Sequence, residues 1–351
     1  MADCRLKSWR RHNRRAAFWL LGAFAASQLV LAVVVDQGSL EIRDPEYVLL
    51  QDKLRDREAE APDNPVAVFL GSSRVAHGFD AARSRAESDA TVFNFGIPGS
   101  GPYLQTVILD RLAQAGVRYD ILVLEVLHTF YNATGPRSLD HSLLDGARLS
   151  AGEAAGLLHY GSPVRTGPLR RWFYARALPS NRHQAELRDA LQIDVFRPGR
   201  GPTPPFEPID PFGFRPLEIP RDKWEEFTAL AHRQYDPYFA RFRLDPAPWG
   251  RLLMAIDQAR GAGADVVIVL MPEATGFRRL YTSDCRDGIA EMIRRLRDEV
   301  GVTVVDARDW VEDSGFYDHH HLLPPGAAAF ADRFHSDALL PALERRAKSR
   351  N

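Results

Sequence analysis

Five short runs of apolar, often β-branched residues limit the possible folds of this 351-residue chain more than any other feature. Helical periodicity separates most of them, as in segments 101–117 and 248–264. Continuous apolar runs of this length are typical of strands covered on both faces in a parallel sheet. The alternation predicts a doubly wound α/β domain, in which ligands bind beyond the carboxyl ends of the strands. The five predicted strands contain VAVFL (66–70), TVFNF (91–95), ILVLEV (121–126), DVVIVLM (265–271) and VTVVDA (302–307).

Segment 130–248, after the third predicted strand, departs from this pattern. It is rich in Pro, Gly, Arg and aromatic residues, as in RPGRGPTPPFEPIDPFGFRP, and is too long for a single strand-to-helix connection. We expect an insertion, partly helical, that caps the carboxyl edge of the sheet. A surface for docking a partner is equally consistent with this composition.

The N-terminal region predicts a membrane anchor. Segment 16–35 is uncharged and about long enough to cross a bilayer core as a helix, and six basic residues lie just before it. We therefore expect a single-pass protein of the cytoplasmic (inner) membrane, with a cytoplasmic tail at 1–15, a connector at 36–65 and the main domain, 66–345, outside in the periplasm. A cleaved signal peptide is the alternative, but the apolar run is longer than the usual one of roughly 7–15 residues.

The composition narrows the class of partner. Lys and Arg number 45 against 46 Asp and Glu, so the net charge gives no reason to expect nucleic acid. Of the two cysteines, Cys4 precedes the apolar segment and Cys285 follows it, so the predicted membrane separates them and no disulfide within the chain is expected.

Two adjacent serines, Ser72 and Ser73, follow the first predicted strand and Gly71. On a doubly wound fold they occupy the turn before a helix, next to backbone N–H groups that a helix start leaves unpaired. Such N–H groups can hold an oxyanion. Serine is also a favoured helix N-cap, which by itself requires no catalysis.

The segment after the fifth predicted strand supplies the partners that a serine nucleophile needs. In DHHHLLPPGA, Asp318 lies three residues before His321, and two prolines suit the first turn of a final helix. A base must take the serine proton, and a carboxylate must hold the imidazole tautomer. Three consecutive histidines also suggest a metal, but neighbouring loop residues point in different directions, so we expect no metal site. His319 and His320 are expected to face solvent or to support the other residues.

Three blocks in this order resemble the GDSL/SGNH hydrolases. FLGSSR resembles the first block, with Ser73 in the place of the nucleophile, and DHHHLLPPGA resembles the last, which gives Asp318 and His321 the roles of orienting acid and base. FNFGIPGSG resembles the second block and maps the oxyanion glycine onto Gly99, with Gly96 as the alternative. The resemblance implies a flavodoxin-like three-layer α/β/α fold with a five-stranded sheet, and makes the N–H of Ser73 a second oxyanion donor.

The remaining block departs from that family's pattern. The family usually carries an asparagine that donates to the oxyanion after the third strand, whereas LEVLHTFYN offers His128 or Thr129 there and Asn132 a few residues later. Loss of one such donor would cost roughly 3–4 kcal/mol of transition-state stabilisation. Either His128 takes its place as the oxyanion donor or the enzyme is slow.

Charged residues near the serine pair are harder to interpret. Arg74 could bind an anionic acceptor or acyl carrier, but an arginine on the helix surface is the interpretation we favour. Glu125 and Glu273, at the ends of the third and fourth predicted strands, are not distinguishable by sequence from solvated loop charges.

SGNH variants with a GSS motif behind an N-terminal anchor resemble the alginate O-acetyltransferase group and the D-alanyl-transfer protein of teichoic acid assembly. The resemblance implies an anchored serine esterase or O-acyltransferase, with no cofactor, that acts on an acylated glycan or glycolipid of the cell envelope. A membrane-bound acyltransferase is then an expected partner. The alternative is a non-catalytic binding or assembly component of an envelope polysaccharide modification complex.

Overall fold

The computed structural model describes residues 2–38, 40–135, 139–159, 166–190 and 208–350. These residues form two compact units. The first contains the N-terminal helix together with residues 145–159 and 166–190. The second begins at Glu46 and contains the sheet, the candidate site and the C-terminal helices.

The sheet of the second unit has five parallel strands in the order β2-β1-β3-β4-β5. This confirms the predicted α/β class and all five predicted strands. The register places Gly71 of β1 opposite Gly96 of β2, so both strands end at the same edge of the sheet. The strands are β1 (Val66–Gly71), β2 (Thr91–Gly96), β3 (Ile121–Glu125), β4 (Asp265–Leu270) and β5 (Thr303–Asp306).

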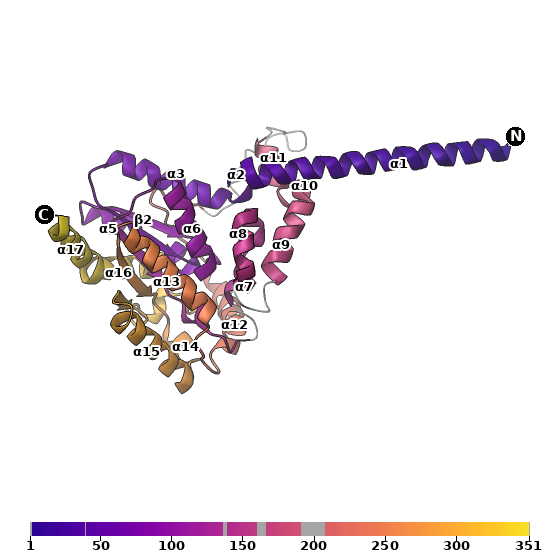
Figure 1. Cartoon of the computed structure of the whole chain (residues 1–351). Coiled ribbons are helices and arrows are strands. Elements are labelled where there is room, and N and C mark those ends of the chain that lie inside the picture. Colours follow the sequence, from indigo (N-terminus) through magenta and orange to yellow (C-terminus); the bar gives the residue numbers. More distant parts are fainter. Residues whose placement is uncertain (1, 39, 136–138, 160–165, 191–207, 351) are drawn as a thin grey trace. The chain divides into compact units, whose positions relative to one another are not determined.

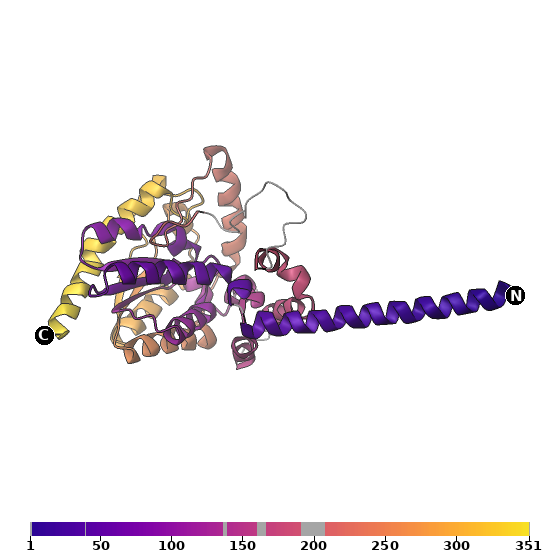
Figure 2. The same ribbon diagram turned by 90° about the horizontal axis from the view of Figure 1, so that it is seen from above.

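Helices form two layers around this sheet (Figures 1 and 2). In one layer α6 (Pro102–Gln114) packs on α13 (Pro246–Gly261), and α15 (Ser283–Asp298) contacts β5. In the other, α16 (Pro324–Phe334) packs on α4 (Ser73–Gly78) and α5 (Ala81–Ala86). The second unit also contains α3 (Pro45–Glu60), α7 (Leu139–Leu143), α12 (Trp224–Tyr235), α14 (Thr275–Arg278) and α17 (Leu340–Arg350).

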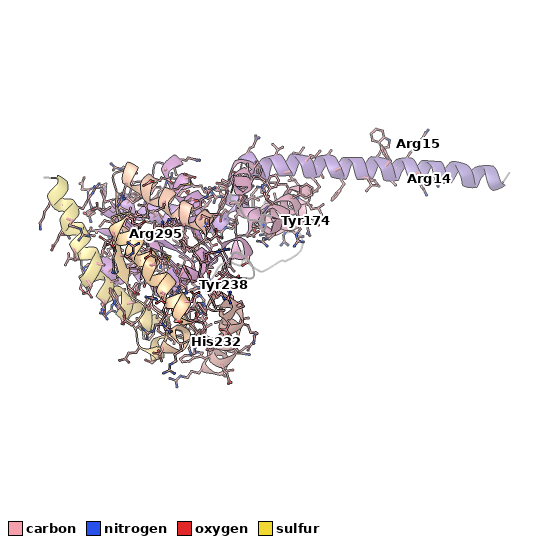
Figure 3. The ribbon with its side chains drawn as sticks, turned by 60° about the horizontal axis from the view of Figure 1, so that its bottom comes forward. Arg14, Arg15, Tyr174, His232, Tyr238 and Arg295 are labelled. Atoms are coloured by element: carbon pink, nitrogen blue, oxygen red, sulfur yellow. The ribbon has the colours of Figure 1, made fainter. Side chains whose placement is uncertain are left out.

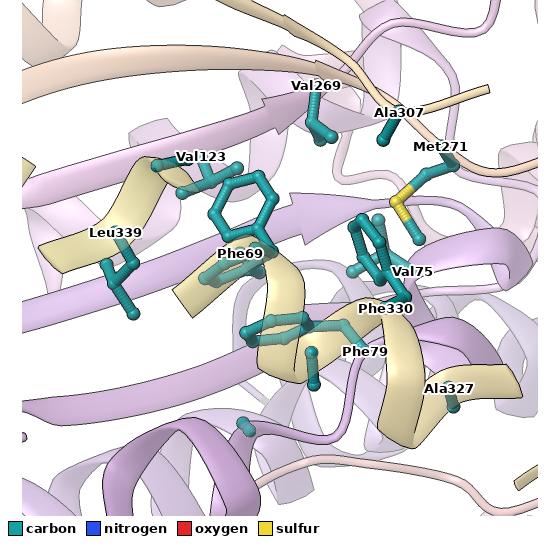
Figure 4. Close-up of a cluster of buried hydrophobic side chains, with 14 of the residues drawn as sticks. Phe69, Val75, Phe79, Val123, Val269, Met271, Ala307, Ala327, Phe330 and Leu339 are labelled. Atoms are coloured by element: carbon teal, nitrogen blue, oxygen red, sulfur yellow. The ribbon is translucent and has the colours of Figure 1, made fainter. Parts of the chain in front are cut away.

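An aromatic core holds α16 against the sheet (Figure 4). Phe69 of β1 stacks on Phe79, with ring centroids 3.4 Å apart, and meets Phe334 of α16 at 5.0 Å. All three side chains are fully buried, and each stabilises the fold by roughly 1.5–3 kcal/mol through burial. This core fixes the two segments that flank the candidate site, because α4 follows β1 and α16 follows the DHHHLLPP loop.

The first unit is helical where it is described. Its longest helix is α1 (Ala2–Val33), and one segment, Asn13–Gln37, is long and apolar enough to cross a membrane. This confirms the predicted N-terminal helix, which overlaps the predicted span 16–35. The other α-helices described in this unit have four to twelve residues: α2 (Leu40–Arg43), α8 (Ala151–Gly156), α9 (Thr166–Ala177), α10 (Pro179–Arg182) and α11 (Gln184–Ala190).

The long connection between β3 and β4 confirms the predicted insertion after the third strand. Its described parts are divided between the units: α8 to α11 belong to the first, whereas α7, α12 and α13 belong to the second. Most of the Pro-rich stretch quoted above lies outside the described residues. The expectation that the insertion caps the sheet edge remains a prediction.

Candidate active site

The serine pair lies where β1 turns into α4. Ser72 has extended backbone angles and is the N-cap, and its hydroxyl accepts a hydrogen bond from the Arg74 N–H at 3.3 Å. Gly71 is required here because a Cβ would lie 2.4 Å from Val75 Cγ2 and 2.6 Å from Glu125 Oε2. The N-cap interpretation therefore applies to Ser72, which leaves Ser73 as the half-buried first residue of the helix.

Ser73, His321 and Asp318 form a continuous hydrogen-bonded chain. The Ser73 Oγ lies 2.8 Å from His321 Nε2, and His321 Nδ1 lies 2.7 Å from Asp318 Oδ2. An ionised carboxylate can only accept, so Nδ1 carries the proton, and in the neutral ring Nε2 is left to accept the Ser73 hydroxyl proton. The structure thus brings together three residues that sequence analysis selected, although 248 positions separate the serine and the histidine.

The loop from 317 to 323 sets the orientation of this histidine. Asp318 Oδ1 accepts the backbone N–H groups of His320 at 3.2 Å and His321 at 2.8 Å, which makes a tight turn. His319, which lies between Asp318 and His320, has a φ of +77°, a left-handed conformation that is strained for a non-glycine residue. One carboxylate therefore both shapes the turn and contacts the ring of His321.

The charge of Asp318 is stabilised within the site. Burial alone would raise the pKa of Asp318, but His321 and His320, with the hydrogen bonds from His321, outweigh burial and hold the pKa well below its usual range. The side chain is an acceptor across the neutral pH range.

His320 is not solvent-facing, contrary to one of the two roles expected for it. Its side chain is 5% exposed, stacks on Phe277 at 5.2 Å and meets Tyr235 edge-on at 4.9 Å. Burial and the neighbouring His321 lower the pKa of His320 well below the usual value, so the ring is neutral. No local pattern indicates the burial of His320, because Tyr235 comes from the insertion.

Asp318, His320 and His321 are also the residues of this site that could hold a metal ion. One ligand atom from each lies within 4.8 Å of the others. Two of these residues, Asp318 and His321, are hydrogen-bonded to each other in the Ser73–His321–Asp318 chain. A metal on His321 would therefore compete with the hydrogen bonds of that chain.

The backbone N–H groups of the predicted oxyanion donors, Gly99 and Ser73, have no acceptor among the described residues, and their oxyanion role remains a prediction. Gly99 has a φ of +76°, which favours glycine, and its N–H has no hydrogen-bond partner among the described residues. Ser73 is the first residue of α4, so its N–H has no acceptor within the helix. Gly96, the alternative, serves packing: a Cβ there would lie 2.3 Å from the Ala76 nitrogen.

Asn94 ties the second block to α4, a role that sequence analysis did not assign. Its Nδ2 donates to the carbonyl oxygens of Val75 and Phe79, and its Oδ1 accepts the Gly96 N–H at 2.9 Å. The asparagine of FNFGIPGSG thus fixes the end of β2 relative to the helix that begins with the serine.

His128 lies in an aromatic environment. It is 1% exposed, its ring lies 4.9 Å from Tyr281 and 5.7 Å from Phe239, and its Nε2 has no hydrogen-bond partner among the described residues. Burial, with Arg308 and Arg74 nearby, lowers its pKa well below the usual value. Its oxyanion role remains a prediction.

The side-chain amide of Asn132 forms its hydrogen bonds with residues of the insertion. Its Nδ2 donates to the carbonyl oxygens of Tyr238 at 2.7 Å and Arg241 at 2.6 Å, and its Oδ1 accepts from Arg243 and Thr134. Both ends of the amide are occupied in a residue that is 2% exposed. The amide is therefore used to hold the insertion in place.

The expectation of a surface arginine at position 74 is wrong. Arg74 is 3% exposed, with Nη1 3.2 Å from Glu273 Oε1 and Nε 3.8 Å from Glu125 Oε1, and its Nη2 donates to two backbone carbonyls after β4. Glu125 Oε2 accepts the Ser72 N–H at 2.6 Å, and the Tyr281 hydroxyl donates to Glu273 at 2.6 Å. The two glutamates are buried partners of Arg74, rather than solvated loop charges.

A second histidine, His77, stands one turn after Ser73. Its ring meets that of His321 edge-on, with centroids 5.9 Å apart, and its Nδ1 lies 3.0 Å from the Arg215 carbonyl oxygen. Burial, together with His321, lowers the pKa of His77 to about 4. A neutral ring therefore lies beside the histidine of the triad. The i, i+4 spacing from Ser73 was the available sequence signal.

Comparisons with known proteins add only distant likenesses. No family model and no curated protein matches the chain. Among solved structures, it is similar to a proposed acylhydrolase from Bacteroides fragilis at 11% identity and a TM-score of 0.37, covering 84% of this chain and 96% of that one. An α/β hydrolase from the metagenome of Lake Arreo, Spain, has 10% identity and a TM-score of 0.36, covering 78% and 94%. A proposed platelet activating factor from Streptococcus pneumonia has 12% identity and a TM-score of 0.33, covering 92% and 98%. Similarity at this level says nothing about the function of the present chain.

Proposed function

We propose that this protein is a membrane-anchored serine esterase or O-acyltransferase that acts on an acylated glycan or glycolipid of the cell envelope. One observation carries the proposal: the unbroken Ser73–His321–Asp318 hydrogen-bonded chain, with distances of 2.8 and 2.7 Å, at the carboxyl edge of a parallel sheet. A nucleophile, a base and an orienting acid in this arrangement are the recurring parts of acyl-transfer sites.

The chemistry follows from these contacts. The Ser73 oxygen attacks the carbonyl carbon of an ester while His321 Nε2 takes the hydroxyl proton, and Asp318 stabilises the imidazolium that forms. The N–H groups of Gly99 and Ser73 stabilise the oxyanion. The tetrahedral intermediate collapses, the alcohol leaves with the proton from His321, and the acyl group stays on Ser73. A second alcohol or water then attacks this ester by the same steps in reverse.

Substrate class and location rest on other observations. The Asn13–Gln37 helix and the basic residues before it support an anchor in the inner membrane, with the sheet unit outside. The resemblance to SGNH variants of envelope acylation supports a glycan or glycolipid, with a membrane-bound acyltransferase as partner. Hydrolysis and transfer differ in whether water is excluded from the acyl-enzyme.

The test is a pre-steady-state assay of the full-length protein in a non-ionic detergent with 4-nitrophenyl acetate. The proposal predicts a burst of nitrophenol equal to the enzyme concentration and an acetyl group on Ser73 by mass spectrometry. Ser73→Ala should lose both, whereas Ser72→Ala is the matched control and should keep both. A wild-type protein with native thermal unfolding but no burst would contradict the proposal.

The non-catalytic alternative is favoured by one specific observation. The amide of Asn132, which follows the third strand, is bonded to the insertion, and His128 is enclosed by aromatic rings. Envelope acylation in cells carrying Ser73→Ala separates the two candidates: unchanged acylation would favour a binding or assembly role, and its loss would favour catalysis.

A further inference from the structure

The turn from α9 into α10 exposes an unusual amount of apolar surface. Phe173 is 62% exposed, Tyr174 61% and Leu178 42%, and the two aromatic rings lie edge-on with centroids 6.3 Å apart. Single exposed apolar side chains are ordinary, but adjacent large ones commonly mark an interaction surface. Tyr174 is labelled on this helix in Figure 3.

Two contacts fix this turn against the helical segment Asn13–Gln37 at two heights. Arg176 donates from Nε and Nη2 to Asp36 Oδ1, at 3.0 and 2.9 Å. Four residues later, Ser180 Oγ donates to Gln28 Oε1 at 2.9 Å. Gln28 lies eight positions before Asp36, which corresponds to about 12 Å along a helix. From Arg176 to Ser180 the chain therefore runs along α1 into its apolar stretch.

The lower contact lies at a level that lipid would surround. The neighbouring α1 side chains Leu29, Val30 and Val33 are 69%, 64% and 55% exposed. Gln28 is 6% exposed, so its amide is shielded and satisfied by Ser180. A polar side chain at this depth of a membrane span needs such a partner, because hydrocarbon offers none.

The upper contact, between Arg176 and Asp36, contains residue types that are typical of the membrane–water interface. The Arg176 guanidinium pairs with Asp36 and lies 5.7 Å from the Trp172 ring. Arginine and aromatic side chains are enriched where headgroups meet hydrocarbon, since one end of each prefers water and the other does not. In sequence, Phe173 and Tyr174 directly follow Trp172, and Leu178 lies between Arg176 and Ser180.

We propose that the α9–α10 turn, with Phe173, Tyr174 and Leu178, dips into the outer leaflet of the membrane that α1 crosses. The anchor then consists of α1 together with this apolar wedge from the insertion. This inference rests on the proposed membrane span and would fail with it, although the span does not depend on the wedge.

Depth-dependent fluorescence quenching tests the wedge on the full chain in phosphatidylcholine nanodiscs. Cys4→Ser leaves one native cysteine, Cys285, which is fully buried and whose pKa burial raises to about 12, so it should not react with a thiol label. An environment-sensitive thiol fluorophore is placed singly at Phe173→Cys, at Leu29→Cys on α1, or at Met254→Cys on α13. Met254 is 56% exposed and serves as the matched aqueous control.

We expect labels at positions 173 and 29 to emit at shorter wavelength and to lose fluorescence when nitroxide-bearing lipids are included, and the label at position 254 to do neither. Quenching at position 29 without quenching at 173 would overturn the wedge and leave the span intact. Quenching at neither position would overturn the span and the wedge together.

Discussion

Ser73 and Arg74 are consecutive residues with opposite environments, and the groups of residues around them have different roles in the candidate site. Ser73 is half-buried and reaches His321 on a loop from the far end of the chain. Arg74 is 3% exposed and is held by glutamates from the ends of β3 and β4. The first cluster has groups free to exchange a proton, whereas the second holds fixed charges.

The difference indicates how the position of the nucleophile is secured. Glu125 accepts the Ser72 N–H and also faces Arg74, so it joins the end of β3 to the first turn of α4. The buried cluster, Arg74 with Glu125 and Glu273, thus fixes the start of α4. The accessible cluster, Ser73 with His321 and Asp318, includes the first residue of that helix as the proposed nucleophile.

Asp318→Asn should reduce the acyl-transfer rate by about 10⁴-fold. The amide oxygen can still accept the N–H groups that shape the loop, but the variant loses the negative charge that stabilises a protonated His321. The burst rate with 4-nitrophenyl acetate measures this. A loss below about tenfold would mean that the accessible cluster is not a triad.

Arg74→Met should destabilise the fold by about 3–5 kcal/mol, because it leaves Glu125 and Glu273 buried without their counter-charge. Urea unfolding followed by circular dichroism gives the free energy. Arg83→Met is the control: Arg83 is half-exposed in its pair with Asp332, where solvent screens the interaction, so its loss should destabilise the fold far less than the loss of Arg74. Equal losses in the two variants would contradict a structural role for the buried cluster.

The stability of the sheet unit should fall as pH drops from 6.5 towards 4. Burial and His321 lower the pKa of His77 to about 4, so between these values the unfolded chain binds more protons than the folded one, and protonation favours unfolding. The contribution of His77, about 3 kcal/mol, is complete above pH 6.5. His77→Gln should reduce the pH dependence of the urea midpoint, while His128 and His320, whose pKa values are also lowered, keep the rest. An unchanged slope would mean that His77 does not contribute to it.

Ser72→Ala should have the smallest effect. It removes an N-cap hydrogen bond to Arg74 N–H and should cost about 1 kcal/mol of stability with the acyl-transfer rate nearly unchanged. Thermal unfolding and the burst assay together measure this. A large loss of rate would show that the two serines do not have separate roles.

Much of the fold and three residues of the candidate site could be predicted from the sequence, for a common reason. Strand and helix patterns are local, and in a parallel sheet the carboxyl ends of strands meet at one edge whatever their separation along the chain. Ser73 and His321 could therefore be expected near each other before any contact was known.

The errors have an equally physical origin. The burial of Arg74 depends on Glu125 and Glu273, which come from two strands whose lateral order the local pattern does not state. The burial of His320 depends on Tyr235 from the insertion, where no periodic pattern predicts the packing. Local sequence patterns do not predict which charged groups or aromatic rings from distant segments will bury a given side chain.

Labelling of the full-length protein with a fluorophosphonate probe shows whether Ser73 is an activated nucleophile, because such probes react with activated serines. We expect labelling of the wild type and of Ser72→Ala, and loss of labelling in Ser73→Ala and His321→Ala. No labelling of a folded wild type, or labelling that persists in Ser73→Ala, would contradict the proposed role of Ser73.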